Sequence, residues 1–141
     1  MEQVIQVFND LNKNSGFLGV SGVSSDSRDI EDGIKNGNER CELAQNIFCQ
    51  RVANYIAMYN NILGGADVIV FTAGLGENSI DTRINIAEKI KSLGVELDIE
   101  ANNVRGKTTL ISTEDSKIPM YIVPTDEELM IALDTMEIIS K

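Results

Sequence analysis

Histidine and tryptophan are absent from this 141-residue sequence, and proline and cysteine occur only twice each. Without histidine, no imidazole can serve as a general base, a metal ligand or a switch near neutral pH. Any catalysis must therefore use carboxylates, lysine, arginine or backbone groups. Cys41 and Cys49 fall in one predicted long helix with their α-carbons about 12 Å apart, too far for a mutual disulfide. We predict two reduced packing residues, as in a cytoplasmic protein.

Basic residues are few beside acidic ones, with 12 Lys and Arg against 22 Asp and Glu and a formal net charge of −10. This charge repels nucleic acid and anionic membranes, so we expect neither as a partner. No apolar run reaches the length of a membrane span, and the N-terminus lacks the basic region of a secretion signal. We therefore expect a soluble, cytoplasmic protein. With 43% hydrophobic residues, the chain is long enough for one domain with its own core.

Hydrophobic periodicity and breaker residues predict an alternation of helices and strands, which indicates an α/β layered domain. The first helix is expected to face the core, and residues 15 to 29 are expected to form a glycine- and serine-rich loop. The predicted helices cover residues 2–13, 29–34, 38–63, 84–93 and 125–139. The predicted strands cover residues 68–71, 95–99, 108–112 and 118–123.

A buried strand, a glycine turn and a helix start follow one another within thirteen residues. Val68–Phe71 is a continuous apolar run, typical of a parallel strand buried on both faces. The turn after it contains Gly74 and Gly76, which are free to take positive φ and leave the main chain open to a ligand. Asn78 or Ser79 is a suitable N-cap for the next helix. Open α/β sheets bind ligands at this end of their strands, so a binding site is expected here.

Several nucleotide motifs share this outline. A Walker loop needs a lysine after its last glycine, but Glu77 follows Gly76 here, which excludes that motif. The dinucleotide fingerprint is nearly matched from Gly74 to Ser79, with Glu96 or Asp98 as a possible ribose ligand. A carboxylate beside a polyphosphate repels it, so the turn suits a neutral adenosine better than a pyrophosphate. The remaining alternative is a glycine turn that only closes a strand-helix unit.

A family resemblance distinguishes these alternatives. The segment Val70-Phe-Thr-Ala-Gly-Leu-Gly-Glu-Asn-Ser79 resembles the adenosine-binding segment of acetate kinases. Segments at 15–29, 102–107, 111–113 and 123–132 match the family's pattern in the same order. The resemblance covers this whole sequence but only about the last third of the family's chain.

The resemblance implies half of the duplicated ribonuclease-H-like architecture of acetate kinases, sugar kinases and actin. Residues 1–141 would form a single C-terminal nucleotide-binding domain. The family transfers the γ-phosphoryl of ATP reversibly to acetate, giving acetyl phosphate and ADP with Mg2+. The family's catalytic residues precede the matched part, so no catalytic residue is expected here and the isolated chain should be inactive. Acetate would bind through the missing N-terminal domain, and a homodimer is expected.

The same resemblance implies the site residues. The ATP-binding candidates are Asp26, Ser27, Arg28, Gly74, Leu75, Gly76, Glu77 and Asn78. A planar guanidinium such as that of Arg28 can stack on a purine, although Asp26 could simply cap a helix. Glu127 is the metal candidate, in a segment where Asp126 replaces the family's usual Asn. The alternative is that this glutamate only favours the helix dipole.

Three alternative functions remain open. The acyl acceptor could be propionate or butyrate, because acyl selectivity lies in the missing part. An NAD-type dinucleotide-binding domain is the second alternative. A non-catalytic dimerisation module, with a vestigial nucleotide pocket, is the third.

Overall fold

The structure of the chain, a computed structural model, describes residues 2–140. Its helices are α1 (Glu2–Lys13), α2 (Gly16–Ser21), α3 (Ser27–Lys35), α4 (Glu39–Leu63), α5 (Ala73–Asn78), α6 (Ile80–Lys89), α7 (Ile99–Asn102) and α8 (Glu127–Ile139), with a 3-10 turn η1 (Lys91–Leu93). Its strands are β1 (Ile69–Phe71), β2 (Thr109–Leu110) and β3 (Met120–Ile122).

The three strands form a small mixed sheet in the order β1-β3-β2. β1 runs parallel to β3, with Ile69 opposite Met120, and β2 runs antiparallel to β3. The predicted burial of the first strand on both faces is wrong, because β1 lies at an edge of this sheet and Val70 is 47% exposed. An apolar run indicates that both faces can be covered, but it does not say that this chain covers them.

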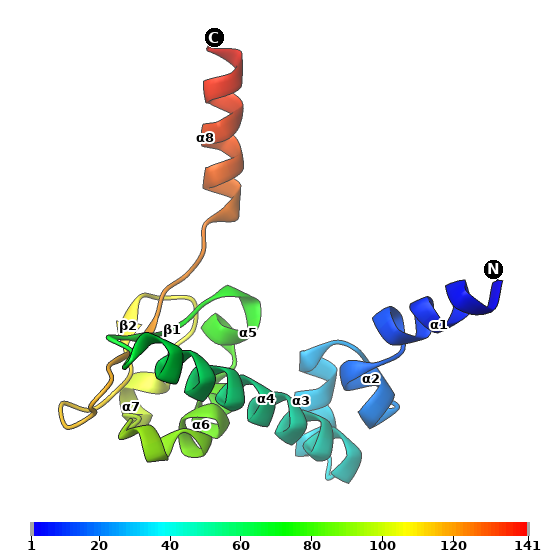
Figure 1. The fold of residues 1–141 in the computed structure, drawn as a ribbon, viewed down its shortest axis with the longest axis horizontal. Helices are drawn as coiled ribbons and strands as arrows, with labels where there is room; N and C mark the ends of the chain where they lie inside the picture. Colours follow the sequence, from blue (N-terminus) through cyan, green and yellow to red (C-terminus); the bar gives the residue numbers. More distant parts are fainter. Residues whose placement is uncertain (1, 141) are drawn as a thin grey trace.

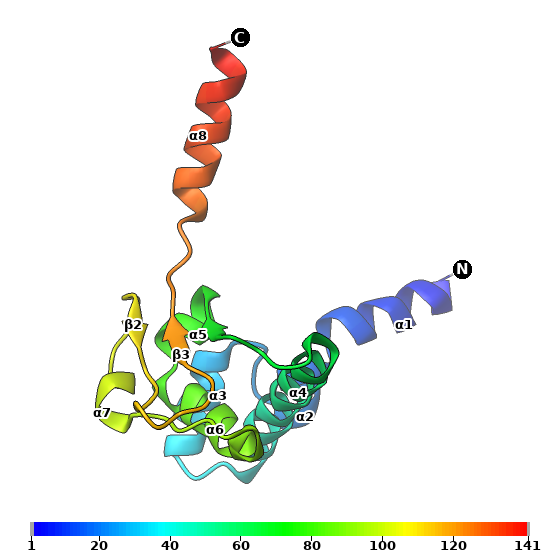
Figure 2. The same cartoon turned by 60° about the vertical axis from the view of Figure 1, so that its left-hand side comes forward.

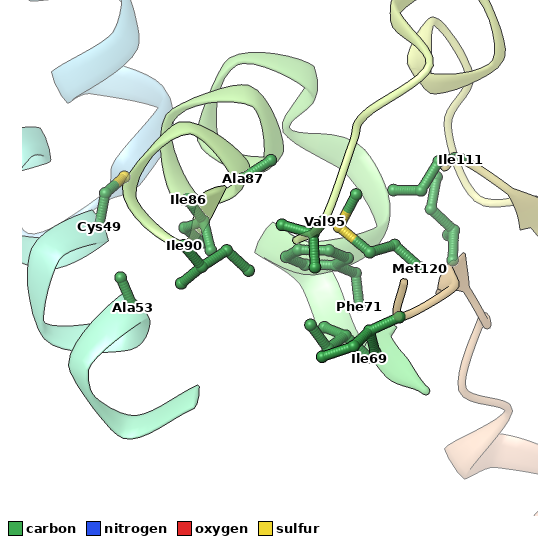
Figure 3. Close-up of a cluster of buried hydrophobic side chains, with 12 residues drawn as sticks. Cys49, Ala53, Ile69, Phe71, Ile86, Ala87, Ile90, Val95, Ile111 and Met120 are labelled. Carbon is green, nitrogen blue, oxygen red and sulfur yellow. The ribbon is translucent and has the colours of Figure 1, made fainter. Parts of the chain in front are cut away.

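The core lies between the sheet and helices α4 and α6 (Figure 3). Ile69 and Phe71 from β1 meet Met120 from β3 on the buried face, and Val95 lies against them. The helical side is supplied by Cys49 and Ala53 of α4 and by Ile86, Ala87 and Ile90 of α6.

The long helix α4 forms one side of this core and carries α2 and α3 along its N-terminal half (Figure 1). Asn38 caps it by accepting hydrogen bonds from the backbone of Arg40 and Cys41, and Gly64 ends it in the left-handed region, as predicted. Cys41 and Cys49 are both buried, and they are not joined to each other in a disulfide. Gly33 lets α3 approach α4 closely, because a Cβ on residue 33 would lie 2.5 Å from the Cys41 sulfur.

Helix α1 has the predicted bounds and α8 begins two residues later than predicted, but neither helix packs on the core. Figures 1 and 2 show α1 and α8 extending away from the body in different directions. Phe8 of α1 is 66% exposed and Ile138 of α8 is 73% exposed. The expectation that helix 2–13 faces the core of this chain is therefore wrong. No helix within residues 2–140 combines the length and apolar character needed to cross a bilayer.

Two other expectations need correction. The predicted loop at 15–29 contains the helix α2, which ends where Gly22 takes φ 71°. The predicted strand at 95–99 is reduced to one antiparallel bridge between Leu97 and Ser112. Ile99 already begins α7, because Asp98 caps that helix by accepting hydrogen bonds from the backbone of Glu100 and Ala101.

Candidate functional site

A cleft of about 480 Å³ lies between α3, α5 and the loop that follows α7. We call it the Arg28 cleft. It is lined by Ser27, Arg28, Glu31, Gly74, Leu75, Asn78, Ser79 and Arg105. Five of the eight predicted ATP-binding residues thus line one cavity, although they come from two distant stretches of the sequence. Asp26, Gly76 and Glu77 do not line it, and each contacts another residue instead.

Asp26 fixes the position of Arg28. Its carboxylate accepts a hydrogen bond from the Arg28 backbone at 2.9 Å and so caps α3, as predicted. The same carboxylate binds the guanidinium, with Nη2 2.6 Å from Oδ2 and Nε 3.0 Å from Oδ1. These hydrogen bonds from Arg28 lower the pKa of Asp26 to about 2. The Arg28 side chain itself is exposed at the cleft, so its flat face is open to a ligand.

The predicted glycine turn is instead the short helix α5. Gly74 and Gly76 do not take positive φ, whereas Ala73 does, at 60°, a conformation that side chains rarely adopt. A Cβ on Gly74 would meet no protein atom within 4 Å, so this glycine borders open space in the cleft. A Cβ on Gly76 would lie 3.2 Å from the carbonyl carbon of Phe71. Gly76 therefore permits helix-strand packing, and Gly74 is the glycine that leaves room for a ligand.

Glu77 connects α5 to the segment that precedes α8. Its Oε1 accepts hydrogen bonds from the Thr125 backbone at 2.8 Å and from the Thr125 hydroxyl at 3.1 Å. One residue further on, Asp126 caps α8 by accepting from the backbone of Leu129 at 2.9 Å.

Glu127 lies exposed in the first turn of α8 and does not line the Arg28 cleft. Among residues 2–140, no three His, Cys, Asp or Glu side chains gather where they could hold a metal ion. A single exposed carboxylate does not fit a magnesium site by itself, because Mg2+ takes several oxygen ligands in octahedral geometry.

Arg83 is a buried cation beneath α5 that the sequence analysis did not single out. Its guanidinium donates to Oδ1 and to the carbonyl of Asn102 at 2.6 and 2.9 Å, and to the carbonyls of Gly76 and Val104 at 2.9 and 2.8 Å. Burial, together with the nearby charge of Arg105, lowers the pKa of Arg83. The detectable signal was its spacing, since Arg83 falls on the same helical stripe as Ile86, Ala87 and Ile90.

Hydrogen-bonded polar side chains link the cleft wall to the core. The Ser79 hydroxyl is hydrogen-bonded to the Glu31 carboxylate and lies 2.7 Å from the Thr82 hydroxyl. Gln45 Nε2 donates to the Thr82 hydroxyl at 2.6 Å. Glu31, one turn after Arg28 on α3, is a cleft residue that the sequence analysis missed, although its helical spacing from Arg28 could have indicated it.

A second hollow, of about 510 Å³, lies between the end of α6 and residues 94–99. It is slightly larger than the Arg28 cleft, but two of its charged side chains, Glu88 and Lys91, already pair with each other at 2.6 Å. None of the candidate ATP-binding residues lines it. The Arg28 cleft is therefore the better candidate site.

Comparison with known proteins identifies a consistent set of relatives. Residues 2–133 match the profile of the Acetokinase family. The acetate kinase of Treponema denticola is 56% identical over 134 residues, which cover 95% of this chain and 34% of that protein. The crystal structure of Porphyromonas gingivalis acetate kinase superposes with a TM-score of 0.88 at 48% identity and covers 97% of this chain and 35% of that one. A propionate kinase from Francisella tularensis gives a TM-score of 0.84 at 37% identity, covering 92% of this chain and 33% of that one.

These matches confirm the predicted fold class, a ribonuclease-H-like α/β domain of the acetate kinase type. The chain spans about a third of the length of the relatives that it matches.

Proposed function

Because this chain belongs to the Acetokinase family, we propose that residues 1–141 form the C-terminal nucleotide-binding domain of an acetate kinase. The domain would hold the adenosine part of ATP or ADP in the Arg28 cleft. The groups that bind acetate and the moving phosphoryl would belong to the remaining two thirds of the protein. The isolated chain would therefore bind adenine nucleotides without catalysing their reaction.

The observation that carries the proposal is the meeting of two sequence segments in one cleft. Ser27 and Arg28 start α3, whereas Gly74, Leu75 and Asn78 belong to α5, and all five line the same space. The volume of about 480 Å³ is within the range of small-molecule sites. This convergence supports a ligand site more strongly than either motif does alone.

The lining suits a nucleoside. The Arg28 guanidinium is held by Asp26, so its planar face can stack on a purine with little further loss of side-chain entropy. Gly74 has no Cβ and allows the ligand to approach the backbone of α5. Asn78 Nδ2 donates to the Gly74 carbonyl at 3.0 Å, which leaves its Oδ1 available as an acceptor. Glu31 can accept from an amino or hydroxyl group of the ligand.

In the whole enzyme, an oxygen of acetate would attack the γ-phosphorus of ATP. The new P–O bond would form as the bond to the β,γ-bridging oxygen breaks, and ADP would leave with that electron pair. The part of this domain would be to hold the adenosine end, so that the transferred phosphoryl is positioned against the acceptor. Glu127 would supply at most one oxygen ligand to Mg2+, and the ion would reduce the negative charge of the bound phosphates.

Other assignments have less support. The likeness to a propionate kinase keeps propionate as a possible acceptor. A dinucleotide site is disfavoured because Gly74 and Gly76 lie within a helix, and because the candidate ribose ligand Asp98 already caps α7.

We also propose a homodimer that uses exposed apolar residues of α4, including Tyr55 and Tyr59, and a cytoplasmic location. A purely structural module would retain these surfaces but would bind no nucleotide.

Calorimetric titration of ADP into wild-type and Gly74→Val protein tests the site. The Cβ of the valine would meet no protein atom within 4 Å and would project into the open space of the cleft, so the fold should persist while ADP binding falls at least tenfold. Ala57→Val is the matched control, because it places the same side chain on an exposed helical position of α4 outside the cleft. Equal ADP affinity in folded Gly74→Val and wild-type protein would refute the assignment. Tighter binding of NAD than of ADP would favour the dinucleotide alternative.

A further inference from the structure

Three arginines surround the glycine helix α5, and they differ in what they bind. Arg28 is paired with Asp26, and Arg83 is buried and donates to four acceptors. Arg105 also lines the Arg28 cleft, but its side chain is exposed and makes no hydrogen bond or ion pair with any other described residue. Arg105 is therefore the positively charged side chain of the cleft lining that has no hydrogen-bond or ion-pair partner among the described residues.

The backbone on both sides of Arg105 is tethered to the cleft wall. Arg83 Nη2 donates to the carbonyl of Val104 at 2.8 Å. The amide of Gly106 donates to the carbonyl of Glu77 at 3.2 Å, which joins the loop to α5. The position of the Arg105 backbone is thus fixed against the nucleotide-lining helix, and only its side chain is left to be ordered by a ligand.

We propose that Arg105 binds the phosphate nearest the ribose and gives the cleft its preference for nucleotides over nucleosides. This inference rests on the proposed function, and it adds a phosphate contact that the candidate ATP-binding residues do not include. A guanidinium presents two parallel N–H donors that match phosphate oxygens, and the ligand's charge strengthens both bonds.

The charged side chains of the cleft favour different parts of a bound nucleotide. Glu31 repels a phosphate but accepts from amino and hydroxyl groups, so the base or the ribose belongs on its side. Arg28 is already neutralised by Asp26 and offers a flat face, which suits the base. Arg105 is the remaining charged group in the cleft lining, and its positive charge favours an anion. Because the proposed contact is to the first phosphate alone, AMP, ADP and ATP should bind this chain with similar affinity.

Calorimetric titration of adenosine and of AMP at low salt tests the proposal with two variants. In the wild-type chain, AMP should bind about tenfold more tightly than adenosine. In Arg105→Gln this difference should disappear, with adenosine affinity unchanged. Lys107→Gln is the matched control, because it removes an equal charge from the same loop at an exposed position that does not line the cleft. It should retain the tenfold preference.

Each other outcome overturns the inference in a recognisable way. If Arg105→Gln weakens adenosine and AMP equally, Arg105 contacts the nucleoside and not the phosphate. If Lys107→Gln removes the preference as well, the effect is one of general charge and not of a specific contact. If AMP binds no more tightly than adenosine in the wild-type chain, the phosphate contact is absent while the adenosine site stands. If neither ligand binds, the inference and the proposed function both fail.

Discussion

Replacing the buried Arg83 by methionine removes a guanidinium that joins α5, α6 and α7 while retaining an unbranched side chain of similar length. The wild-type side chain is 0% exposed and makes four hydrogen bonds. The bonds to Asn102 are buried, whereas those to Gly76 and Val104 are partly buried and can be replaced by water.

The size of the effect follows from these contacts. Two buried acceptors left without a donor cost about 1–3 kcal/mol each. Part of this destabilisation is offset in the methionine variant, because the folded protein no longer buries a charge that has no carboxylate partner. We therefore expect the free energy of unfolding to fall by about 2–3 kcal/mol, a large share of the stability of a typical domain.

Urea unfolding followed by circular dichroism measures this change. The control is Arg51→Met, which makes the same replacement at an exposed position of α4 and should change stability by less than about 0.5 kcal/mol. Arg83→Lys should lie between wild type and Arg83→Met, because lysine keeps the charge but cannot reach all four acceptors. An Arg83→Met protein as stable as wild type would refute the reasoning, since it would show that burial of the cation cancels its hydrogen bonds.

Two further predictions use other parts of the chain. Carbon-detected NMR should show the Asp26 carboxyl titrating with a pKa of about 2, and in Arg28→Gln this pKa should return toward 3.8. Because the pKa is lower in the folded state, the carboxylate's contribution to stability is complete above about pH 3.8 and is lost as the pH falls through 2. A wild-type midpoint near 3.8 would contradict the ion pair. Light scattering should show self-association that Tyr59→Glu on α4 reduces and Phe8→Glu on α1 does not; the reverse result would move the interface to α1.

The elements that the sequence predicted well are those whose ends carry local signals. Asn38 and Gly64 bound α4 as expected, and Asp26 caps α3, because capping depends on residues within one turn of the helix end. The short helix α2 was missed because two of its six residues are glycines, which have low helix propensity. Packing against α4 offsets that propensity, and such a contact is not visible in local sequence.

Burial was predicted less well than secondary structure, for a physical reason. The apolar periodicity of α1 correctly indicated an amphipathic helix, but periodicity does not identify what covers the apolar face. In this chain the face is exposed, as are most apolar side chains of α8 and one face of β1. Nothing in the local sequence of these segments identifies a cover, and the sequence spans about a third of its relatives' length.

The candidate site shows the same division between motif and geometry. The motif residues Gly74, Leu75 and Asn78 line the cleft, yet Glu77 within the same motif turns away and binds Thr125, which is distant in sequence. A carboxylate can only accept hydrogen bonds, and the backbone amide and hydroxyl of Thr125 supply two donors together. The fold thereby ties the segment before α8 to α5. Glu77 therefore adds two side-chain hydrogen bonds to the backbone contact between Val123 and Phe71, which holds the same segment.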